Sequence, residues 1–215
     1  LAFSPDGKVL YSGGCDKLLA HAMPGGAVVA SLGNGNKWGG PDSLDRIDLL
    51  AVTPNGATVL HPGNKAGDDV LVTRQYQDFA LQAEQPLYVS DGAFAAGRFV
   101  ALTGNAIAIV DVDNHEILAE AELLHRPTRW YGGESLAINH EHQLAALILR
   151  EEAEANQPTF ELQVWRLFPL EQIAALPLPG FAISGQTALG GLVFAHGRLI
   201  VVGETSNLSI EYSVG

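Results

Sequence analysis

The sequence predicts an all-β fold built from a repeated unit of four antiparallel strands, and three observations lead to it. A short segment recurs along the chain, an apolar run of strand length follows each copy, and no stretch has the 3.6-residue periodicity of an amphipathic helix. Repetition of a four-stranded unit is typical of a β-propeller, in which each unit forms one blade. We therefore expect a β-propeller with about five recognisable blades.

The repeat is clearest between its first two copies. Leu-Ala-Phe-Ser-Pro-Asp-Gly at residues 1–7 recurs as Leu-Ala-Val-Thr-Pro-Asn-Gly at residues 50–56. Proline followed by Asp or Asn and then Gly favours a tight turn, because proline fixes φ and glycine accepts a positive φ. Weaker copies lie at residues 93–97, 136–142 and 192–197, at spacings near the roughly 40–45 residues of a propeller blade with loop insertions.

The segments after each copy predict three further strands. The second strand is apolar on both faces, which predicts burial between neighbouring sheets. Its copies lie at residues 9–11, 58–60, 99–102, 144–149 and 199–202. The third strand alternates, as Ile107 and Ile109 do, and is expected to be half exposed. Residues 27–32 and 117–121 then supply fourth strands, which gives blade units at residues 1–46, 47–92, 93–131, 132–190 and 191–215.

Two segments resemble the WD-repeat family. The run from Leu1 to Gly14 is similar to that family's first strand, turn and second strand, and the run from Glu161 to Leu167 is similar to its third strand. Trp165-Arg166 stands where the family has Trp-Asp, and no unit has the Gly-His pair that precedes the family's first strand. The resemblance implies a WD-like propeller whose hydrogen-bonded tetrad of His, Ser or Thr, Asp and Trp is absent or degraded.

The resemblance also implies how the ring closes, because an N-terminal segment supplies the outer strand of the last blade in that family. The first unit here opens inside a strand, and the last unit has no fourth strand. We expect residues upstream of Leu1 to complete the ring, so that the chain is an incomplete part of a larger ring of up to seven blades.

The two ends of the predicted sheets differ in their connections. In the resembled fold, the turns between strands one and two and between strands three and four share one end, and here these turns are tight. The connections at the other end carry every long insertion, at residues 33–46, 61–69, 125–135, 151–159 and 178–190. Long loops on a rigid scaffold concentrate binding residues, so we expect recognition at the insertion-bearing end.

Two of these insertions share a motif of an aromatic residue, a glycine pair, an acid and Ser-Leu. Trp38 and Asp42 belong to the first copy, and Trp130, Tyr131 and Glu134 belong to the second. Trp and Tyr provide rigid contact area and are enriched among the residues that dominate binding energy. These side chains are the candidate partner-binding residues. In the alternative interpretation, each Trp fills the groove between neighbouring blades and the glycines only shape the turn.

Composition restricts the class of partner. The formal net charge is -12 at pH 7, which disfavours general binding to nucleic acid or to anionic membranes. No apolar run reaches the roughly 18–20 residues that span a bilayer. Cys15 is the single cysteine, so a disulfide within the chain is excluded and a reducing, cytoplasmic location is expected.

No local catalytic or metal-binding motif is present in the sequence. A nucleophile elbow, a phosphate loop and an HExxH motif are all missing. His140 and His142 lack a third ligand nearby and indicate a solvated turn. The acidic run at Glu151, Glu152 and Glu154 indicates a solvated loop or a contact to a basic partner. We expect no catalytic residue, no metal and no cofactor.

The function expected from these features is a non-catalytic interaction or sensor module of a larger protein, with a protein or another domain of the same polypeptide as its partner. An alternative is a propeller hydrolase or oxidoreductase whose metal or cofactor lies in the central channel. A third is a structural scaffold that joins chains. The fold itself does not select among them, because propellers host many functions.

Overall fold

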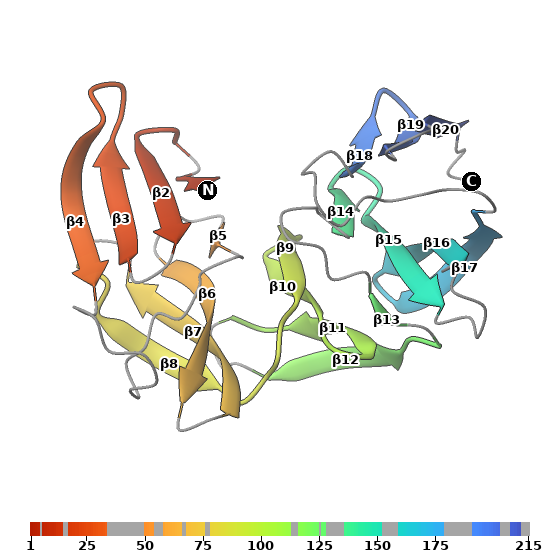
Figure 1. Cartoon of the computed structure of the whole chain (residues 1–215), viewed down its shortest axis with the longest axis horizontal. Coiled ribbons are helices and arrows are strands. Elements are labelled where there is room, and N and C mark those ends of the chain that lie inside the picture. Colours follow the sequence, from red (N-terminus) through yellow and green to blue (C-terminus); the bar gives the residue numbers. More distant parts are fainter. Residues whose placement is uncertain are drawn as a thin grey trace. The chain divides into compact units, whose positions relative to one another are not determined.

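The computed structural model describes residues 1–4, 6–14, 17–33, 50–53, 58–65, 68–75, 78–112, 116–124, 126–127, 136–151, 159–178, 191–202 and 207–211. Within these residues every helix or strand assigned is a β-strand, which confirms the all-β prediction. The chain forms two compact units, Leu1–Val89 and Ser90–Gly215, and Figure 1 shows the strands of each. The strands pair into five sheets, numbered here in chain order.

The first unit contains two four-stranded antiparallel sheets. Sheet 1 consists of β1 (Ala2–Phe3), β2 (Val9–Gly14), β3 (Lys17–Ala22) and β4 (Ala27–Gly33), in that order across the sheet. Sheet 2 repeats the arrangement with β5 (Ala51–Val52), β6 (Thr58–Lys65), β7 (Asp68–Gln75) and β8 (Leu81–Gln85). Each sheet is thus a meander, in which every strand pairs with the next one along the chain.

The second unit contains three sheets with the same meander order. Sheet 3 consists of β9 (Asp91–Ala95), β10 (Arg98–Leu102), β11 (Ala106–Val110) and β12 (Ile117–Glu122). Sheet 4 consists of β13 (Arg126–Pro127), β14 (Leu136–Asn139), β15 (Leu144–Glu151), β16 (Thr159–Leu167) and β17 (Leu170–Pro177), and both β13 and β14 pair with β15. Sheet 5 has three strands among the described residues, β18 (Gly191–Ala195), β19 (Arg198–Val202) and β20 (Asn207–Glu211).

The sequence repeat occupies the same register position in all five sheets. Its large apolar residue lies on the first strand and pairs with the second strand close to the turn. We call this residue and its cross-strand partners the large row, which begins with Phe3, Val52, Phe94, Ile138 and Phe194 in sheets 1 to 5. The repeat is therefore a feature of the fold as well as of the sequence.

The residue before the large row begins a second row of smaller side chains, which we call the small row. It starts with Ala2, Ala51, Ala93, Ala137 and Val193 in sheets 1 to 5. Where a fourth strand is present, the row ends on another alanine, namely Ala30, Ala83, Ala119 or Ala174. Because successive residues of a strand point to opposite faces, each sheet has one face with the small row and one with the large row.

Neighbouring sheets of a unit pack the small row of one against the large row of the next. In the first unit, Tyr11 and Ala20 from the small row of sheet 1 share a core cluster with Val52 of sheet 2. In the second unit, Val100 from the small row of sheet 3 shares a cluster with Trp165 of sheet 4. Alanine on one side leaves room for the bulky side chain on the other, so the two faces interlock.

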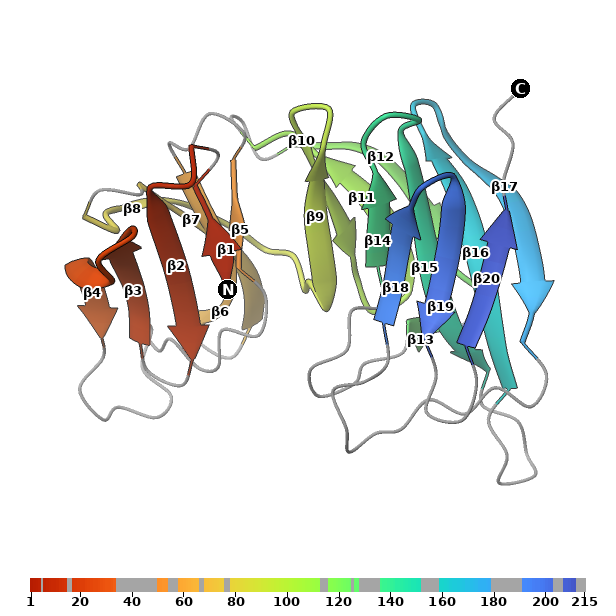
Figure 2. The same ribbon diagram turned by 90° about the horizontal axis from the view of Figure 1, so that it is seen from above.

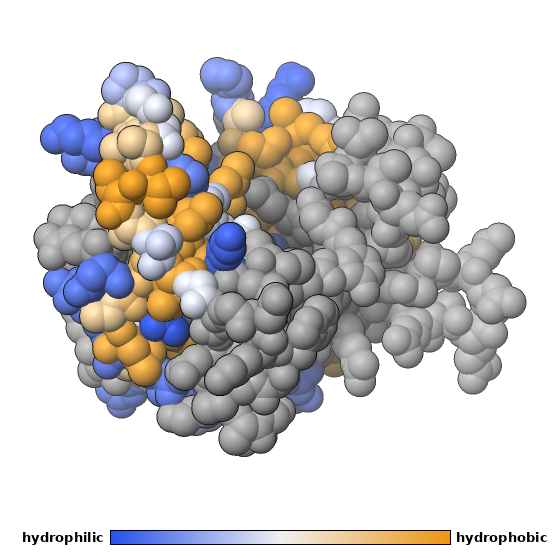
Figure 3. All heavy atoms as spheres, turned by 60° about the vertical axis from the view of Figure 1, so that its left-hand side comes forward, coloured by the Kyte–Doolittle hydropathy of each residue, from blue (hydrophilic) through white to orange (hydrophobic). Residues whose placement is uncertain are grey.

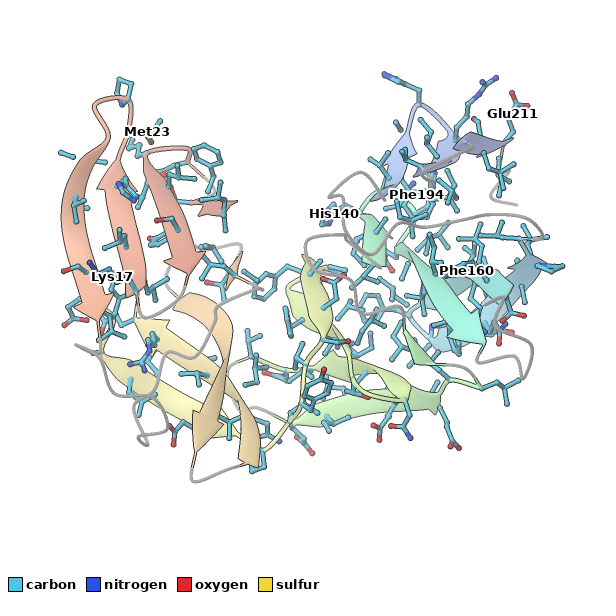
Figure 4. All side chains as sticks on the ribbon, in the orientation of Figure 1. Lys17, Met23, His140, Phe160, Phe194 and Glu211 are labelled. Carbon is cyan, nitrogen blue, oxygen red and sulfur yellow. The ribbon has the colours of Figure 1, made fainter. Side chains whose placement is uncertain are left out.

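The same rule holds between sheets 4 and 5. Ala137 and Ala146 of the small row of sheet 4 share a cluster with Leu199, and Phe194 packs against it. Figure 4 labels Phe194 on β18, the strand that contacts β14. Burying a side chain of this size contributes about 1.5–3 kcal/mol, which makes these rows a main source of stability.

The Pro-Asp-Gly turn predicted between the first two strands is confirmed at Gly7, whose φ is 69°. The Oδ1 atom of Asp6 accepts hydrogen bonds from the Ser4 hydroxyl at 2.7 Å and from the Lys8 N–H at 3.1 Å. The bond from the Lys8 backbone, followed by that from Ser4, lowers the pKa of the Asp6 carboxyl below its usual 3.8. The turn is therefore supported by ionised Asp6 above pH 3.8, and this support is lost as the pH falls through the lowered pKa.

Two hairpins of the second unit use a two-residue turn. Ala96 and Gly97 in sheet 3, and His196 and Gly197 in sheet 5, all have φ between 49° and 78°. Positive φ at both central positions is the type I′ geometry, whose twist matches that of the paired strands. Such short turns fix the register of the first two strands and keep the two rows on their faces.

The burial predicted for the second strands is found in sheets 3 and 4. Residues 99–102 are 0% exposed, and residues 144–149 are at most 4% exposed. The expectation of a half-exposed third strand is wrong for β11, because its alternate residues Ala106 and Ala108 are covered as fully as its isoleucines. In sheet 1 the second strand is buried on one face only, since Tyr11 is 0% exposed and Leu10 is partly exposed.

A β-bulge recurs between the third and fourth strands, and the sequence repeat gave no sign of it. The register shifts by one residue at His21, Arg74, Val110 and Trp165 in sheets 1 to 4. At each shift the pairing register skips one residue of the outer strand, namely Val29, Gln82, Leu118 or Ile173. The bulge directs this residue outward, so that Val29, Leu118 and Ile173 are 60%, 40% and 44% exposed.

Replacing Gly92 by Ala is expected to lower the free energy of unfolding by about 1–3 kcal/mol, because overpacking strains a filled core. A Cβ at Gly92 would lie 2.4 Å from Cζ of the fully buried Phe99 and 2.9 Å from the Val100 carbonyl oxygen. Urea denaturation measures the change. Gly191, on β18, is the matched control, because a Cβ there meets no atom within 4 Å. Equal losses in the two variants would contradict the steric explanation.

Candidate recognition face

The tight turns lie at one end of the sheets in each unit. In the second unit, Figure 2 shows the turns between β9 and β10, β14 and β15, and β18 and β19 at the same end. In sheet 1, Met23 in the turn and Lys17 at the start of β3 mark the two ends of the strand pair (Figure 4). We call the end opposite the tight turns the insertion end.

The strands that flank the longest connections all stop at the insertion end. Residues 34–50 join β4 to β5, residues 152–158 join β15 to β16, and residues 178–190 join β17 to β18. At the other end, by contrast, the turn between β9 and β10 has two residues, Ala96 and Gly97. The strand bounds alone therefore place the longest connections at the insertion end.

The predicted binding residues lie outside the described residues. Trp38 and Asp42 belong to the connection between β4 and β5, and Trp130, Tyr131 and Glu134 belong to the connection between β13 and β14. The strand ends on either side of both connections are at the insertion end. Both the binding role and the alternative groove-filling role of the two Trp residues remain predictions.

Two of the predicted insertions are shorter than expected. The prediction of a loop at residues 61–69 is wrong, because β6 continues to Lys65 and β7 begins at Asp68. The backbone of His61 pairs with Val72 there, so the segment is a long hairpin of sheet 2. The segment 125–135 was expected to be loop throughout, but Arg126–Pro127 pairs with β15 as β13.

Asp91 joins the first strands of sheets 3 and 4 at the insertion end. Its Oδ2 atom accepts a hydrogen bond from the N–H of Leu136 at 3.1 Å, and its Oδ1 atom accepts one from Gly92 at 2.8 Å. Leu136 is the last residue of the second copy of the aromatic motif and the first residue of β14, so Asp91 binds the point where that segment enters β14. The sequence analysis did not predict this role of Asp91. The sequence feature that could have indicated it is an acidic residue immediately before the Gly-Ala-Phe of a repeat copy.

Trp165 occupies the bulge position of sheet 4, where the WD-repeat family has its Trp. It is 5% exposed, and its Nε1 donates to Oε1 of Gln163 at 3.0 Å. The amide of Gln163 in turn donates to Oε1 of Glu161 at 2.6 Å. Arg166, in place of the family's Asp, is exposed and pairs with Glu171 on β17. Trp165 is thus a core residue whose polar atom is satisfied within its own strand.

Other side chains fill the same bulge position in the first unit. In sheet 1, Nε2 of His21 lies 3.0 Å from the Ser12 hydroxyl, and its Nδ1 lies 3.4 Å from the Gly26 carbonyl oxygen. In sheet 2, Arg74 donates to the Phe79 carbonyl oxygen at 3.1 Å. The Gly26 and Phe79 carbonyl oxygens lie between strands three and four, so these contacts tie the bulge residue to that turn.

The turn that contains His140 and His142 is closed by its own residues. The Oδ1 atom of Asn139 accepts from the N–H of His142 at 3.0 Å, and Glu141 lies 4.0 Å from the His142 ring. Across the described ranges, no group of three or more His, Cys, Asp or Glu side chains is arranged to hold a metal ion. Nor do those ranges contain a helix that is long and apolar enough to cross a membrane.

Replacing Asp91 by Ala is expected to lower the free energy of unfolding by about 1–3 kcal/mol, because the two partly buried N–H groups that it binds lose their acceptor. Asp91→Asn keeps one side-chain oxygen and is expected to lose less. The direct readout is the hydrogen-exchange rate of the Leu136 amide, which should rise in Asp91→Ala. An unchanged rate at Leu136 would show that the carboxylate does not hold this strand end.

No protein-family model and no curated protein matches this sequence.

Solved structures do match the fold. Hydrazine synthase of Kuenenia stuttgartiensis aligns with 93% of this chain and 53% of its own, at 14% identity and a TM-score of 0.69. The WD40 domain of Neurospora crassa Pan2 aligns with 92% of this chain and 56% of its own, at 12% identity and a TM-score of 0.64. A complex of KlAtg21 with the coiled-coil of AgAtg16 aligns with 94% of this chain and 62% of that chain, at 11% identity and a TM-score of 0.62.

The chain spans less than two thirds of the length of each of these structures. Identities of 11–14% support the fold alone, because one fold can carry many functions. The repeated meanders, the packing of the small rows against the large rows, and the WD40 domain among the matches agree with one another. This chain has a WD40-like β-propeller fold.

Proposed function

We propose that the chain is a non-catalytic propeller module that recognises a protein partner through its insertion end. The asymmetry between the two ends of the sheets carries this proposal. Tight turns close one end, whereas the connections of residues 34–50 and 178–190 leave from the other. Long connections on a rigid frame are where binding residues concentrate.

The β-sheets next to the insertion end can hold such connections in fixed positions. Strands β10 and β15 are buried along both faces, so sheets 3 and 4 are tightly packed, and sheet 4 carries the connection between β13 and β14. Asp91 fixes the entry to β14 through the Leu136 N–H. A binding segment anchored at its end loses less conformational freedom when the partner binds, which favours affinity.

The contact residues we propose are Trp38, Asp42, Trp130, Tyr131 and Glu134. They lie in two connections that leave the insertion end and carry the same aromatic, glycine-pair and acid motif. Aromatic side chains are enriched among the residues that dominate binding energy at protein interfaces. The acids beside them suit a partner with basic or hydrogen-bond-donating groups around an apolar patch.

The likeness of residues 1–14 and 161–167 to the WD-repeat family supports placing the chain in that family. The WD40 domain among the matched structures agrees with this placement, and the KlAtg21 match is to a propeller-like chain in complex with a coiled-coil. Both favour a protein as the partner class. The net charge of -12 argues in the same direction, because an acidic surface repels nucleic acid.

Replacing Trp38 and Trp130 together by Ala is expected to lower recovery of the partner by at least about tenfold, since loss of an aromatic anchor costs 2 kcal/mol or more. Affinity capture with the purified, tagged chain from a lysate of the source cells measures it. Circular dichroism should be unchanged. The matched control is His140→Ala with Glu141→Ala, two exposed residues at the tight-turn end. Equal recovery with the Trp variant, or loss with the control, would contradict the proposed face.

A propeller enzyme is the second candidate, because one matched structure is hydrazine synthase. An enzyme of this architecture would hold a metal or cofactor. Elemental analysis and the absorption spectrum of the purified chain separate the two candidates. The interaction module is expected to carry no stoichiometric metal and no chromophore, and finding either would overturn the non-catalytic assignment.

A further inference from the structure

The most exposed large apolar side chain of the described residues belongs to Leu124, which is 89% exposed. Apart from Leu1, the other exposed residues of this kind lie on strands, and Figure 3 shows apolar residues gathered in this way on one side of the first unit. Leu124 instead lies in the short connection between β12 and β13. Its neighbour Leu123, at 4% exposure, fills the core cluster of sheets 3 and 4. Core packing therefore does not explain a leucine at position 124.

Leu124 lies at the insertion end of the second unit. Because β10 starts at a tight turn, the connection between β10 and β11 lies at the opposite, insertion end. β12 reaches the same end at Glu122, which pairs with Ala106 at the start of β11. The N–H of Leu123 then donates to the carbonyl oxygen of Asn105 at 2.7 Å. Leu124 is thus at the same end as the connections that carry the proposed contact residues.

The backbone is fixed on both sides of Leu124. On one side, Leu123 is held by its side chain in the core cluster and by its N–H on Asn105. On the other side, β13 pairs with β15 from Arg126 onward. A side chain presented from a fixed backbone loses less conformational freedom when a partner binds, and leucine has fewer rotamers to lose than a long charged side chain. Leu124 is therefore suited to act as an anchor.

We infer that Leu124 is a further contact residue for the protein partner, and that it inserts into an apolar pocket of that partner beside a basic group. The inference rests on the proposed function and extends its contact surface to a described residue. Glu122, two residues before Leu124, is an exposed acid at the same end. Asp42 and Glu134 stand near the aromatic residues of the two motif copies in the same way. An apolar pocket bordered by Lys or Arg complements such a combination.

The exposure of Leu124 separates its effect on binding from its effect on stability. In the free chain its side chain lies in water, so a polar replacement removes little from the core. In the complex the same side chain would be withdrawn from water, and complete burial of a leucine strengthens binding by roughly tenfold or more. A change at Leu124 should therefore weaken recognition and leave the fold unchanged.

Affinity capture with the whole tagged chain from a lysate of the source cells tests the contact. Leu124→Asp should lower recovery of the protein that the wild-type chain captures by about tenfold or more, with circular dichroism and the melting temperature unchanged. Leu118→Asp is the matched control, because Leu118 is a 40% exposed leucine at the tight-turn half of β12. Recovery with Leu124→Asp equal to that of the wild type, or an equal loss with Leu118→Asp, overturns the inference.

Photo-crosslinking identifies what Leu124 touches. With p-benzoylphenylalanine in place of Leu124, irradiation in the lysate should join the chain to the same captured protein, whereas the same residue in place of Leu118 should not. A product made of two copies of the chain, or no product with the captured protein, overturns the inference.

The two proposals can fail separately. Capture that depends on Trp38 and Trp130 but gives no crosslink at position 124 overturns this inference and leaves the proposed function standing. A crosslink at position 124 that persists in the variant with both Trp residues replaced supports Leu124 as a contact and contradicts the proposed aromatic contacts. A wild-type chain that captures no protein overturns both.

Discussion

The structure depends on a match of side-chain size between neighbouring sheets. An alanine and a large apolar residue stand next to each other on the first strand, as Ala93 and Phe94 do, and so they face opposite sides of the sheet. A slip of one residue in the strand register would exchange the two faces and set large side chains against large ones. The short turns, such as Ala96–Gly97 with its positive φ, prevent that slip. Size matching thus fixes the register as well as stabilising the core.

The match of side-chain size restricts which parts of the chain can change in sequence and length. The strands must keep their two rows, and the tight turns must keep their length because they set the register. The long connections at the insertion end, such as residues 34–50 and 178–190, do not set the register of a hairpin, so their length can vary more freely. Asp91 lies where the two regions meet, since its carboxylate binds the backbone at the start of β14.

Local signals in the sequence were enough to predict the repeat, the turn at Gly7 and the burial of residues 144–149.

The features that were missed depend on tertiary pairing. His61-Pro62-Gly63-Asn64 has turn-forming composition, yet it pairs with β7. The described pairing of β5 stops at Leu60, so β6 continues past it with one partner strand, a setting that tolerates proline. The hydrogen bond from Leu136 to Asp91 joins residues 45 positions apart in the sequence, which no local pattern reports. The candidate binding residues are predicted from motif and position and lie outside the described residues.

The bulge in the outer strands has a consequence for how these sheets meet other proteins. A straight outer strand would present an even row of N–H and C=O groups, on which a foreign strand could add and start a fibril. The pairing register skips Val29, Gln82, Leu118 or Ile173, which interrupts that row at the same position in four sheets. Exposed valine, leucine and isoleucine side chains at the rim are thereby kept from seeding aggregation. In sheets 1 to 4 the bulge therefore disfavours the addition of a foreign strand to the outer edge.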